Sequence, residues 1–433
     1  MVTLFPHQKA ALEATATQNR VGYFLDMGLG KTYLGSEKLS ALGAQFNLVI
    51  CQKSKLQDWL EHFKQNYRWY KKGVSANEIF DLTKENEFGA FIASVTFPGD
   101  QKKNMSIGII NYDLIFRRPE LAKLKDFTLM LDESSLIQNE MSKRSKFILK
   151  KLKPKNVILL SGTPTGGKYE RLWSQCHLLG WKISKTAFWD SYVKYHYDDR
   201  QGFPLKIIDG YKNVDRLKHK LREHGAVFMK SEEVFDLPEQ VEQTIFVPTT
   251  REYRRFRKDC IAEYDGTEFV GDTTLTKMLY ERMLCGYANK DKVSAFRDLV
   301  NSTEDRLIVF YNFVNELETL KSILESEERP VSVVNGSERD LSAYDSADNS
   351  VTLIQYQAGA MGLNLQKSNK IVYFTPPLSS ELYEQSKKRT HRIGQNRTCF
   401  YYALTCRNSI EEKIYKTLQM RRDYTEALFE NER

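Results

Sequence analysis

The stretch LDMGLGKT, Leu25 to Thr32, follows the apolar run VGYF and opens the amphipathic stretch KTYLGSEKLSALGA. A strand that leads through a glycine-rich turn into a helix is the context of a phosphate-binding loop. Gly28 and Gly30 let backbone amides turn inward without an obstructing Cβ, and the start of the helix favours a polyphosphate. The pattern predicts that Lys31 reaches the β- and γ-phosphates of a nucleotide and that the Thr32 hydroxyl holds Mg²⁺. The alternative is a glycine-rich turn with an incidental lysine.

Short apolar runs alternate with amphipathic stretches in both halves of the chain. The runs typical of buried parallel strands are VGYFLDM (21–27), FNLVICQ (46–52), IGIINYD (107–113), FTLMLDE (127–133), NVILLSG (156–162), RLIVFYNF (306–313), PVSVVNG (330–336), VTLIQYQ (351–357), KIVYFT (370–375) and CFYYALTC (399–406). Their alternation with helix-like stretches predicts an α/β protein with two parallel sheets in tandem. We expect an N-terminal lobe over 1–235 and a C-terminal lobe over 236–433.

The middle of the chain reads differently, because from about Trp181 to Val300 the pattern becomes mostly helical and rich in aromatic residues, as in KTAFWDSYVKYHY (185–197). We therefore expect a helical extension of the first lobe from about residue 181. A further helical segment is expected at 250–300. The chain closes on a long helix over SIEEKIYKTLQMRRDYTEALF (409–429).

The composition is that of an ordinary soluble protein, with 433 residues, 41% of them hydrophobic and 28% charged. No apolar run approaches the roughly 18 residues of a membrane span, and the start of the chain lacks the apolar core of a signal peptide. Six cysteines without a CxxC pair suggest neither a zinc site nor a disulfide framework. We expect a reduced intracellular compartment, the cytoplasm of a bacterium or of a phage-infected cell.

The net charge is +8, and its distribution is uneven. Basic residues gather in KRSKFILKKLKPK (143–155), REYRRFRK (251–258) and KKRTHRIGQNR (387–397). Clustered lysine and arginine release counterions when they meet a phosphate backbone. Solvated helix faces are the alternative interpretation of each cluster.

A second informative stretch, FTLMLDESSLIQN (127–139), ends an apolar strand in two acids. Ligands of an α/β sheet bind beyond the carboxyl ends of its strands, which is where the phosphate loop would also lie. The pair is therefore predicted to serve one nucleotide, Asp132 as a ligand of Mg²⁺ and Glu133 as the group that orients or deprotonates the attacking water. Without the phosphate loop the pair would read as an acidic surface loop.

The third component is cationic. QSKKRTHRIGQ (385–395) places Arg389 and Arg392 three residues apart on a predicted helix, and hence on one face. Charge that builds up on a transferring phosphoryl group favours a rigid bidentate cation, arginine rather than lysine. A solvated basic helix end is the alternative.

In this order, the segments resemble the Swi/Snf-type branch of the superfamily 2 helicase-like ATPases. The resemblance spans nearly the whole chain. It is carried by LFPHQKAALE, by the first motif DMGLGKT, by the acidic motif DESSLIQN, by the third motif LLSGTPTGGKYERLWSQCHLL, by the fifth motif AGAMGLNLQKSNKIVYF and by the sixth motif QSKKRTHRIGQ. It implies the ATP-binding residues Gln8, Gly28, Leu29, Gly30, Lys31 and Thr32, the metal ligands Thr32 and Asp132, and the catalytic residues Glu133, Gln385, Arg389 and Arg392. It also implies a role in coupling or DNA contact for Ser161, Thr163, Gly359, Gly362 and Asn364.

The resemblance further implies two RecA-like lobes that share one ATP, with Mg²⁺ as cofactor. A compact bacterial or phage-like motor is expected, a monomeric DNA-dependent ATPase that moves along double-stranded DNA through contacts to phosphates. The alternatives are a strand-separating DNA or RNA helicase and an ATP-gated DNA clamp or scaffold without productive turnover. Two departures from the family pattern stand out, Leu25 where the strict phosphate loop has glycine and Ser135 where the acidic motif usually has histidine.

Overall fold

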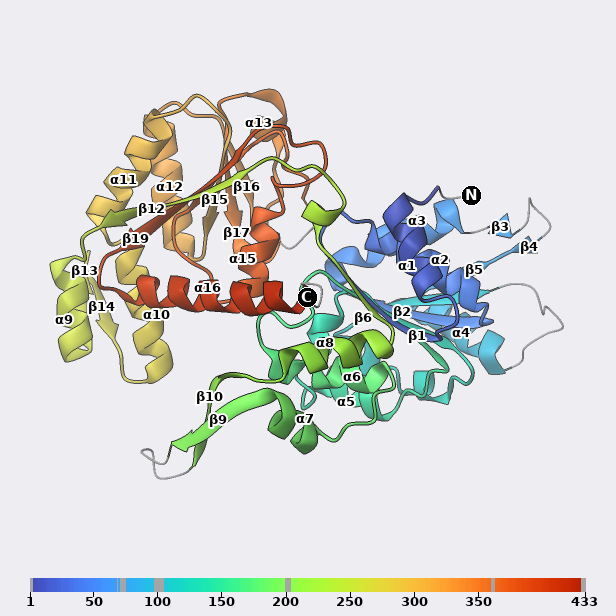
Figure 1. Cartoon of the computed structure of the whole chain (residues 1–433). Coiled ribbons are helices and arrows are strands. Elements are labelled where there is room, and N and C mark those ends of the chain that lie inside the picture. The colour runs from blue at the N-terminus through green and yellow to red at the C-terminus, as the bar shows by residue number, and fades with distance from the viewer. Residues whose placement is uncertain are drawn as a thin grey trace. The chain divides into compact units, whose positions relative to one another are not determined.

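The computed structural model describes residues 3–67, 69–70, 75–96, 105–198, 204–359 and 363–429 and divides into two compact units (Figure 1). Unit 1 comprises Met1–Val234 together with Tyr424–Arg433, and unit 2 comprises Phe235–Asp423. The division falls inside the last helix, α16 (Ile410–Phe429). Each unit is built on its own parallel sheet, so the expected α/β class with two sheets in tandem is confirmed.

Unit 1 contains a seven-stranded sheet in which every neighbouring pair is parallel. In spatial order its strands are β11 (Ala226–Met229), β1 (Arg20–Leu25), β8 (Asn156–Ser161), β7 (Thr128–Leu131), β2 (Phe46–Cys51), β6 (Ser106–Asn111) and β5 (Glu78–Asp81). All five strands predicted for this lobe are present. Because the central strands are buried on both faces, they are almost continuously apolar.

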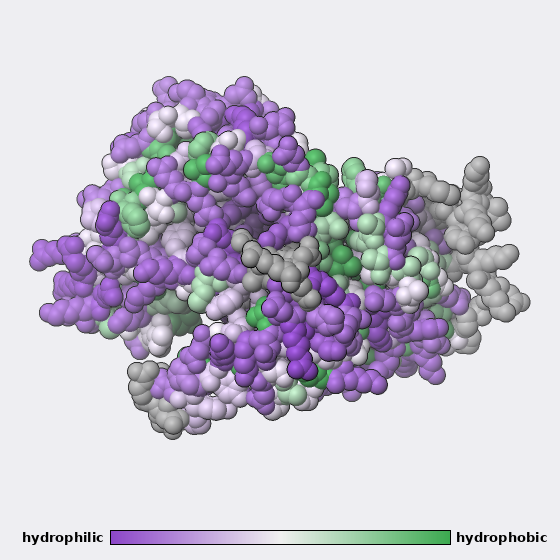
Figure 2. Space-filling model, viewed as in Figure 1, coloured by the Kyte–Doolittle hydropathy of each residue, from purple (hydrophilic) through white to green (hydrophobic). Residues whose placement is uncertain are grey.

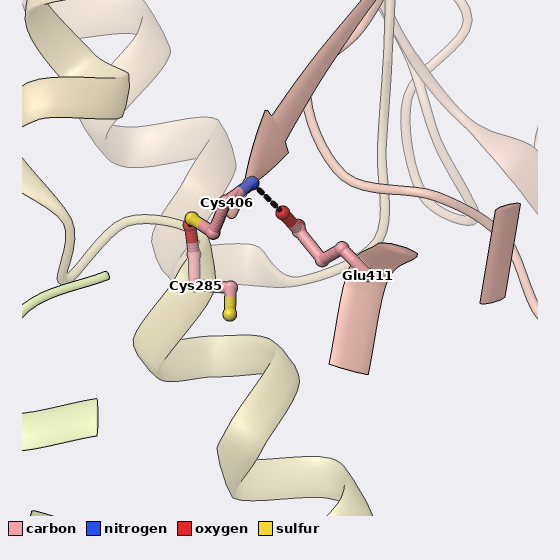
Figure 3. A group of neighbouring side chains, drawn as sticks. All are labelled: Cys285, Cys406 and Glu411. Carbon is pink, nitrogen blue, oxygen red and sulfur yellow. Dashed lines mark hydrogen bonds between the residues drawn. The ribbon is translucent and has the colours of Figure 1, made fainter. Parts of the chain in front are cut away.

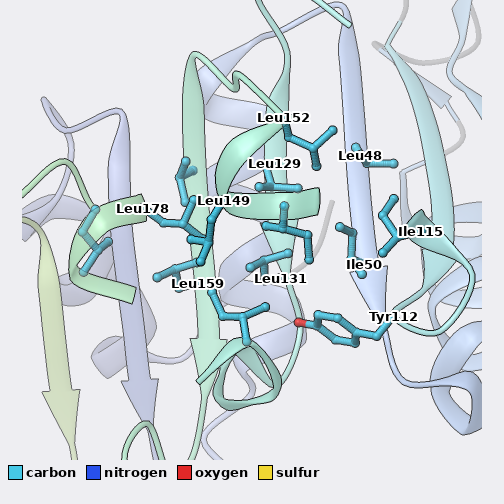
Figure 4. Close-up of a cluster of buried hydrophobic side chains, with 14 of the residues drawn as sticks. Leu48, Ile50, Tyr112, Ile115, Leu129, Leu131, Leu149, Leu152, Leu159 and Leu178 are labelled. Atoms are coloured by element: carbon cyan, nitrogen blue, oxygen red, sulfur yellow. The ribbon is translucent and has the colours of Figure 1, made fainter. Parts of the chain in front are cut away.

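Helices cover both faces of this sheet (Figure 1). They are α1 (Pro6–Ala14), α2 (Lys31–Leu42), α3 (Leu56–Asn66), α4 (Glu85–Thr96), α5 (Lys143–Lys150), α6 (Trp173–Leu178), α7 (Lys185–Tyr192) and α8 (Val214–Glu223). On one face the core is built from alternate strand residues, Leu48 and Ile50 of β2, Leu129 and Leu131 of β7, and Leu159 of β8 (Figure 4). Helix α2 packs against β7 and β8, and α3 packs against β5 and β6.

Unit 2 contains a six-stranded sheet, also parallel throughout. In spatial order its strands are β12 (Gln240–Val247), β19 (Cys399–Cys406), β18 (Lys370–Tyr373), β15 (Leu307–Tyr311), β17 (Val351–Gln355) and β16 (Val331–Val334). The helices of this unit before α16 are α9 (Arg251–Asp259), α10 (Thr274–Cys285), α11 (Lys290–Asn301), α12 (Val314–Ser326), α13 (Ser342–Ser346), α14 (Tyr356–Gly359) and α15 (Ser380–Lys387). The five strands predicted for the second lobe and the long final helix are all present.

The expectation of a mostly helical middle is only partly met. Helix α7 ends at Tyr192, and the chain continues into an antiparallel hairpin of β9 (Val193–Asp198) and β10 (Leu205–Tyr211). A second hairpin, β13 (Ile261–Tyr264) with β14 (Thr267–Val270), lies between α9 and α10. The aromatic and β-branched residues that suggested packed helix faces therefore also form strands, where such residues are equally at home. In addition, β11 and β12 of the middle region are edge strands of the two main sheets.

No helix in the described part of the chain combines the length and apolar character needed to cross a bilayer.

Candidate active site

The predicted phosphate loop joins β1 to α2 in unit 1. Both glycines have left-handed backbone angles, with φ of 90° at Gly28 and 71° at Gly30, a region that L side chains rarely adopt. Gly30 is the N-cap of α2 and Lys31 is its first residue. The first backbone amides of this helix, which have no acceptor within the helix itself, therefore lie at the end of a strand, as an anion-binding loop requires.

The Lys31 ammonium folds back over the loop, where it donates hydrogen bonds to the carbonyl oxygens of Leu25 (2.8 Å) and Asp26 (3.1 Å). The Lys31 Nζ would lie 3.4 Å from a Cβ built on Gly162, the second residue of the SGTP segment. The first and third sequence motifs are therefore side by side. Thr32 follows on the first turn of α2 with a half-buried side chain.

Gln8, which the resemblance implies is an ATP-binding residue, lies on α1 and is buried beside the phosphate loop. Its amide nitrogen donates to the carbonyl oxygens of Leu29 (3.2 Å) and Gly30 (3.1 Å), and its amide oxygen accepts from the backbone of Phe5 (2.9 Å). Leu29 itself is buried, so its side chain supports the loop from within. Gln8 therefore lies against the phosphate loop, and its role in ATP binding stays a prediction.

The acidic pair follows β7, which is separated from β1 by β8 alone. Since strands are spaced by about 4.8 Å, the acidic segment begins roughly 10 Å from the phosphate loop, at the same carboxyl edge of the sheet. The Asp132 carboxylate accepts a hydrogen bond from the indole nitrogen of Trp59 at 2.8 Å. The hydroxyl of Tyr112 donates to the Asp132 carbonyl oxygen, also at 2.8 Å. Both the backbone and the side chain of Asp132 are therefore held in place.

The electrostatics of Asp132 reflect its enclosed position. Burial raises the pKa of this carboxyl above its ordinary value, and the Trp59 hydrogen bond and the charges of Lys31 and Lys55 act in the opposite direction. A buried carboxylate that has lost much of its hydration gains from binding a small dication, which supplies the countercharge and fills the carboxylate's coordination sites. Carboxylate and hydroxyl oxygens are the donors that Mg²⁺ prefers, so Asp132 and Thr32 fit the metal that the sequence predicted.

Glu133 adopts a left-handed backbone conformation with φ of 50°, which is unusual for a residue with a side chain. It is the N-cap of the short 3₁₀ helix Ser134–Ile137. Its carboxylate lies 3.5 Å from the Ser161 hydroxyl at the end of β8. The Thr163 amide donates to the same hydroxyl at 3.2 Å. The predicted water-activating residue and the third motif therefore belong to one local network.

Glutamines that the sequence did not single out complete this network. Gln175 on α6 accepts from the Ser134 hydroxyl (2.9 Å) and donates to the carbonyl oxygen of Pro164 (2.6 Å). Gln138 donates to that same carbonyl at 3.0 Å. The acidic motif is thereby tied to the third motif. Ser135, which stands where the family has histidine, is buried in the same turn.

The remaining predicted residues belong to unit 2. Here the expectation that Arg389 and Arg392 share a helix face is wrong, because α15 ends at Lys387 and both arginines lie in the turns that follow. The backbone turns at Gly394, whose φ is 92°, and the side-chain amide of Gln395 donates to the carbonyl oxygens of residues 366 and 368, which fixes a non-helical path.

The fifth and sixth motifs nevertheless lie together. The Leu365 amide donates to the Arg389 carbonyl at 3.2 Å. Arg389 is buried and Arg392 is half-buried, and burial lowers the pKa of the Arg392 guanidinium, which stays charged. Gln385 lies on α15 and donates to Glu381 at 3.4 Å.

Among the fifth-motif residues, Gly359 ends α14 and Asn364 is exposed, whereas Gly362 lies outside the described residues.

Unit 2 also brings Cys285, Cys406 and Glu411 together with a metal-like spacing (Figure 3). The Glu411 carboxylate accepts from the buried ammonium of Lys292 at 2.6 and 2.7 Å, and from the Cys406 amide at 2.9 Å. The Cys406 thiol in turn lies 3.4 Å from the carbonyl oxygen of Cys285. The positive charge in this cluster is thus supplied by the protein, and the arrangement is that of a buried structural ion pair.

Comparison with known proteins agrees with this order of motifs. The SNF2-related domain matches residues 7–292, and the helicase conserved C-terminal domain matches residues 291–394. The chain is similar to the putative ATP-dependent helicase/translocase YwqA of Bacillus subtilis, with 24% identity over 99% of this chain and 49% of that protein. It is also similar to the SWI/SNF-related matrix-associated actin-dependent regulator of chromatin subfamily A member 1 of Mus musculus, with 22% identity over 92% of this chain and 40% of that protein.

Among solved structures, the chain is similar to the SWI2/SNF2 ATPase core of Sulfolobus solfataricus in complex with double-stranded DNA. The identity is 19%, the TM-score is 0.44, and the match covers 98% of this chain and 92% of that one. The chain spans about half the length, or less, of the curated relatives named here. The two matched domains follow one another along the chain in the order that the sequence resemblance implied.

Proposed function

Because the chain belongs to the family of SNF2-related domains, we propose that it is an ATP-dependent motor that acts on double-stranded DNA and hydrolyses ATP to ADP and phosphate. One observation carries the proposal. A glycine loop with its lysine and an Asp–Glu pair lie at the same edge of one sheet, close enough for the charge of Lys31 to act on the Asp132 carboxyl and oppose the rise in its pKa that burial causes. The sheet of unit 1 alone would therefore bring the phosphates of a bound nucleotide close to the carboxylates of the Asp–Glu pair.

The residues of unit 1 divide the chemistry among them. The amides of the phosphate loop and Lys31 hold the β- and γ-phosphates, for which Lys31 exchanges its present carbonyl partners. Thr32 and Asp132 hold Mg²⁺, which supplies charge neutralisation of the phosphates when bound. Glu133 accepts a proton from the attacking water or orients it, and Ser161 places the Glu133 carboxylate through their shared contact.

The residues of unit 2 contribute after the units close on the nucleotide. Arg389 and Arg392 stabilise charge on the γ-phosphate in the transition state, and Gln385 supports them, which is a role known for arginines in related phosphoryl transfer. Contacts to DNA are made mainly with phosphates, so binding is tolerant of sequence and weakens with salt. Ser161, Thr163, Gly359, Gly362 and Asn364 belong to the segments proposed to couple hydrolysis to these contacts. We further propose that the motor acts as a monomer inside the cell.

The DNA part of the proposal is supported by relatives. The Bacillus relative carries the name helicase/translocase, and the Sulfolobus core is described in complex with double-stranded DNA. Translocation along the duplex is the reading that we favour, and strand separation and an ATP-gated clamp are the outcomes that would replace it.

The test is phosphate release, measured with duplex DNA, single-stranded DNA, RNA and no nucleic acid. Wild-type protein is expected to turn over ATP fastest with duplex DNA. Lys31→Ala should lose ATP use, and Glu133→Gln should bind ATP without hydrolysing it. Glu140→Gln is the matched control, since it removes a carboxylate seven residues further on that pairs with Lys185.

Two outcomes would contradict the proposal. Equal turnover with and without duplex DNA would favour the clamp. Release of a strand from a forked duplex at the rate of ATP use would favour a strand-separating helicase. The translocase is expected instead to displace the third strand of a DNA triplex and to leave a forked duplex intact.

A further inference from the structure

Helix α9 of unit 2 carries the basic stretch REYRRFRK, which contributes no residue to the candidate active site. Tyr253 and Phe256 are buried in the local core, and the cationic residues point outward. The exposed cations are Arg251, Arg254, Arg255, Arg257 and Lys258. The helix lies at the end of unit 2 formed by α9, β13, β14 and α10 (Figure 1), and the surface there is hydrophilic (Figure 2).

These five cations are not neutralised by the protein. In the described part of the chain, no carboxylate lies within ion-pairing distance of any of them, although Glu252 and Asp259 belong to the same helix. Like charges three or four residues apart on a helix repel one another, at about 0.2–0.5 kcal/mol for each pair. Because no carboxylate of the described chain offsets this repulsion, the five positive charges can bind an anion of another molecule.

Three of the cations surround a hollow of about 430 Å³. The hollow is lined by Thr249, Tyr253, Arg254, Arg257, Lys258 and Asn408, without a carboxylate. The guanidinium of Arg254 donates to the carbonyl oxygen of Thr249 at 3.0 Å, and that of Arg257 to the carbonyl oxygen of Asn408 at 2.8 Å. Both arginines are therefore held in place, which lowers the entropy lost when they bind an anion.

A further cation is the sequence neighbour of a residue that lines the hollow. Arg407 is exposed, precedes Asn408 in sequence, and lies over the ring of Phe246 at 4.7 Å. Three cations that line the hollow and one beside it in sequence are thus all exposed. We refer to Arg254, Arg257, Lys258 and Arg407 as the α9 patch.

The sheet of unit 2 sets where the α9 patch lies. Helix α9 follows β12 and Arg407 follows β19, both at the carboxyl edge of the parallel sheet. The fifth motif, which begins after β17, leaves the same edge four strand spacings away, or roughly 19 Å. That separation is smaller than one helical turn of duplex DNA, which is about 34 Å.

We propose that the α9 patch is a second contact for the phosphate backbone of duplex DNA, separate from the nucleotide site and from the fifth motif. The proposal rests on the proposed function, because it takes the DNA on which the motor acts as the ligand. Duplex DNA carries a negative charge for about every 1.7 Å of its axis. A rigid group of arginines without acidic neighbours suits such an array, and it lengthens the stretch of duplex that unit 2 holds.

The experiment compares two double variants of unit 2, each of which removes one arginine and one lysine. Arg254→Gln with Lys258→Gln removes two charges of the patch. Lys321→Gln with Arg339→Gln removes the same charge near β16, at the opposite edge of the sheet. In the control pair Arg339 is exposed, whereas Lys321 is half-buried and lies 3.9 Å from the carboxylate of Glu338. Affinity for a duplex is measured by fluorescence anisotropy at several salt concentrations, with the full chain and without nucleotide.

The loss of two phosphate contacts should lower the slope of log K against log salt by about 1.8 and weaken binding by up to about sixty-fold near 0.1 M salt. The control pair should keep the wild-type slope. Arg254→Lys with Lys258→Arg keeps the charge and should also keep the slope. ATP turnover without DNA should be unchanged in the patch variant, and the DNA concentration that gives half-maximal stimulation should rise.

A slope equal to that of wild type in the Arg254 and Lys258 variant would overturn the proposal while leaving the motor intact. Weaker binding of poly-glutamate by this variant, with unchanged binding of DNA, would also overturn it and would indicate an acidic protein partner. If the wild-type protein itself does not bind duplex DNA, the proposed function is wrong. The wild-type measurement therefore distinguishes failure of the proposed function from failure of the α9 patch proposal.

Discussion

The hydrogen bond from Trp59 to Asp132 offers a sharp test of how the metal-binding carboxylate is held. In Trp59→Phe the ring remains to pack against its neighbours in α3, and the indole N–H that donates to Asp132 at 2.8 Å is lost. A hydrogen bond to a charged group contributes about 1.5–3 kcal/mol. The carboxylate of Asp132 is thus expected to lose that much of its stabilisation in the ionised form.

The loss should be visible in the metal dependence of turnover. The bond also holds the carboxylate in one orientation, and if all of its about 1.5–3 kcal/mol serves that orientation, its loss weakens the apparent affinity for Mg²⁺ by roughly 10-fold to 150-fold at most. The pKa of Asp132, already raised by burial, should rise further, since the Trp59 bond is the largest influence that lowers it. The acid limb of the pH profile of kcat/KM should therefore move to higher pH. The assay is ATP hydrolysis with duplex DNA, titrated with Mg²⁺ at several pH values.

Trp173→Phe is the matched control, because its indole donates to the carbonyl oxygen of Ile183 at 2.9 Å in the same unit, without contact to the acidic pair. Both variants lose one hydrogen bond and should lose similar stability in a thermal melt. Only Trp59→Phe should change the Mg²⁺ dependence. Equal Mg²⁺ titrations for Trp59→Phe and wild type would refute the positioning role of Trp59.

Three further predictions concern other parts of the chain. In Gly30→Ala the new Cβ would lie 2.2 Å from the side-chain amide of the glutamine on α1, at a positive φ, so ATP binding measured by calorimetry should be lost. The control is Gly43→Ala, which also has a positive φ but no atom within 4 Å of the new Cβ, and it should lose only about 1–2 kcal/mol of stability. Arg392→Ala should lower kcat far more than it raises the Kd for ATP, because its charge acts in the transition state. Glu411→Gln should lower the free energy of unfolding by about 3–5 kcal/mol, since it leaves the Lys292 ammonium buried without its carboxylate, as denaturant melts would show.

Each of these has an outcome that would contradict it. Unchanged ATP affinity in Gly30→Ala would show that the loop can move away from the glutamine. A parallel loss of ATP binding and turnover in Arg392→Ala, absent in the exposed neighbour Arg397→Ala, would assign Arg392 to ground-state binding. A Glu411→Gln variant as stable as wild type would mean that Lys292 finds another partner or releases its proton.

The strands of both sheets could be predicted because their signal is local and strong. A strand buried on both faces is apolar along its whole length, as in β2 and β8, and tolerates few other interpretations. The phosphate loop and the acidic pair were equally local, since each combines a strand end with a short run of diagnostic residues. Parallel topology then placed them at one edge without further information.

Features that depend on distant residues escaped prediction. Trp59 and Asp132 are 73 residues apart, and Trp59 lies in an amphipathic helix where a tryptophan normally reads as core. Gln175 is 41 residues from the serine whose hydroxyl donates a hydrogen bond to it. The path of Arg389 was missed for a similar reason, because the helix is ended by side-chain contacts from Gln395 to residues 366 and 368, which local helix propensity does not register.

The left-handed backbone conformation of Glu133 lowers the thermal stability of the folded protein, because a residue with a side chain is strained there. Glycine or asparagine would occupy that conformation with less strain, so a library screened for heat resistance alone should repeatedly replace this acid. A chain selected for durability would thus drift toward an inert variant. A glutamate in this strained conformation is what is expected of a site that gives up stability for turnover.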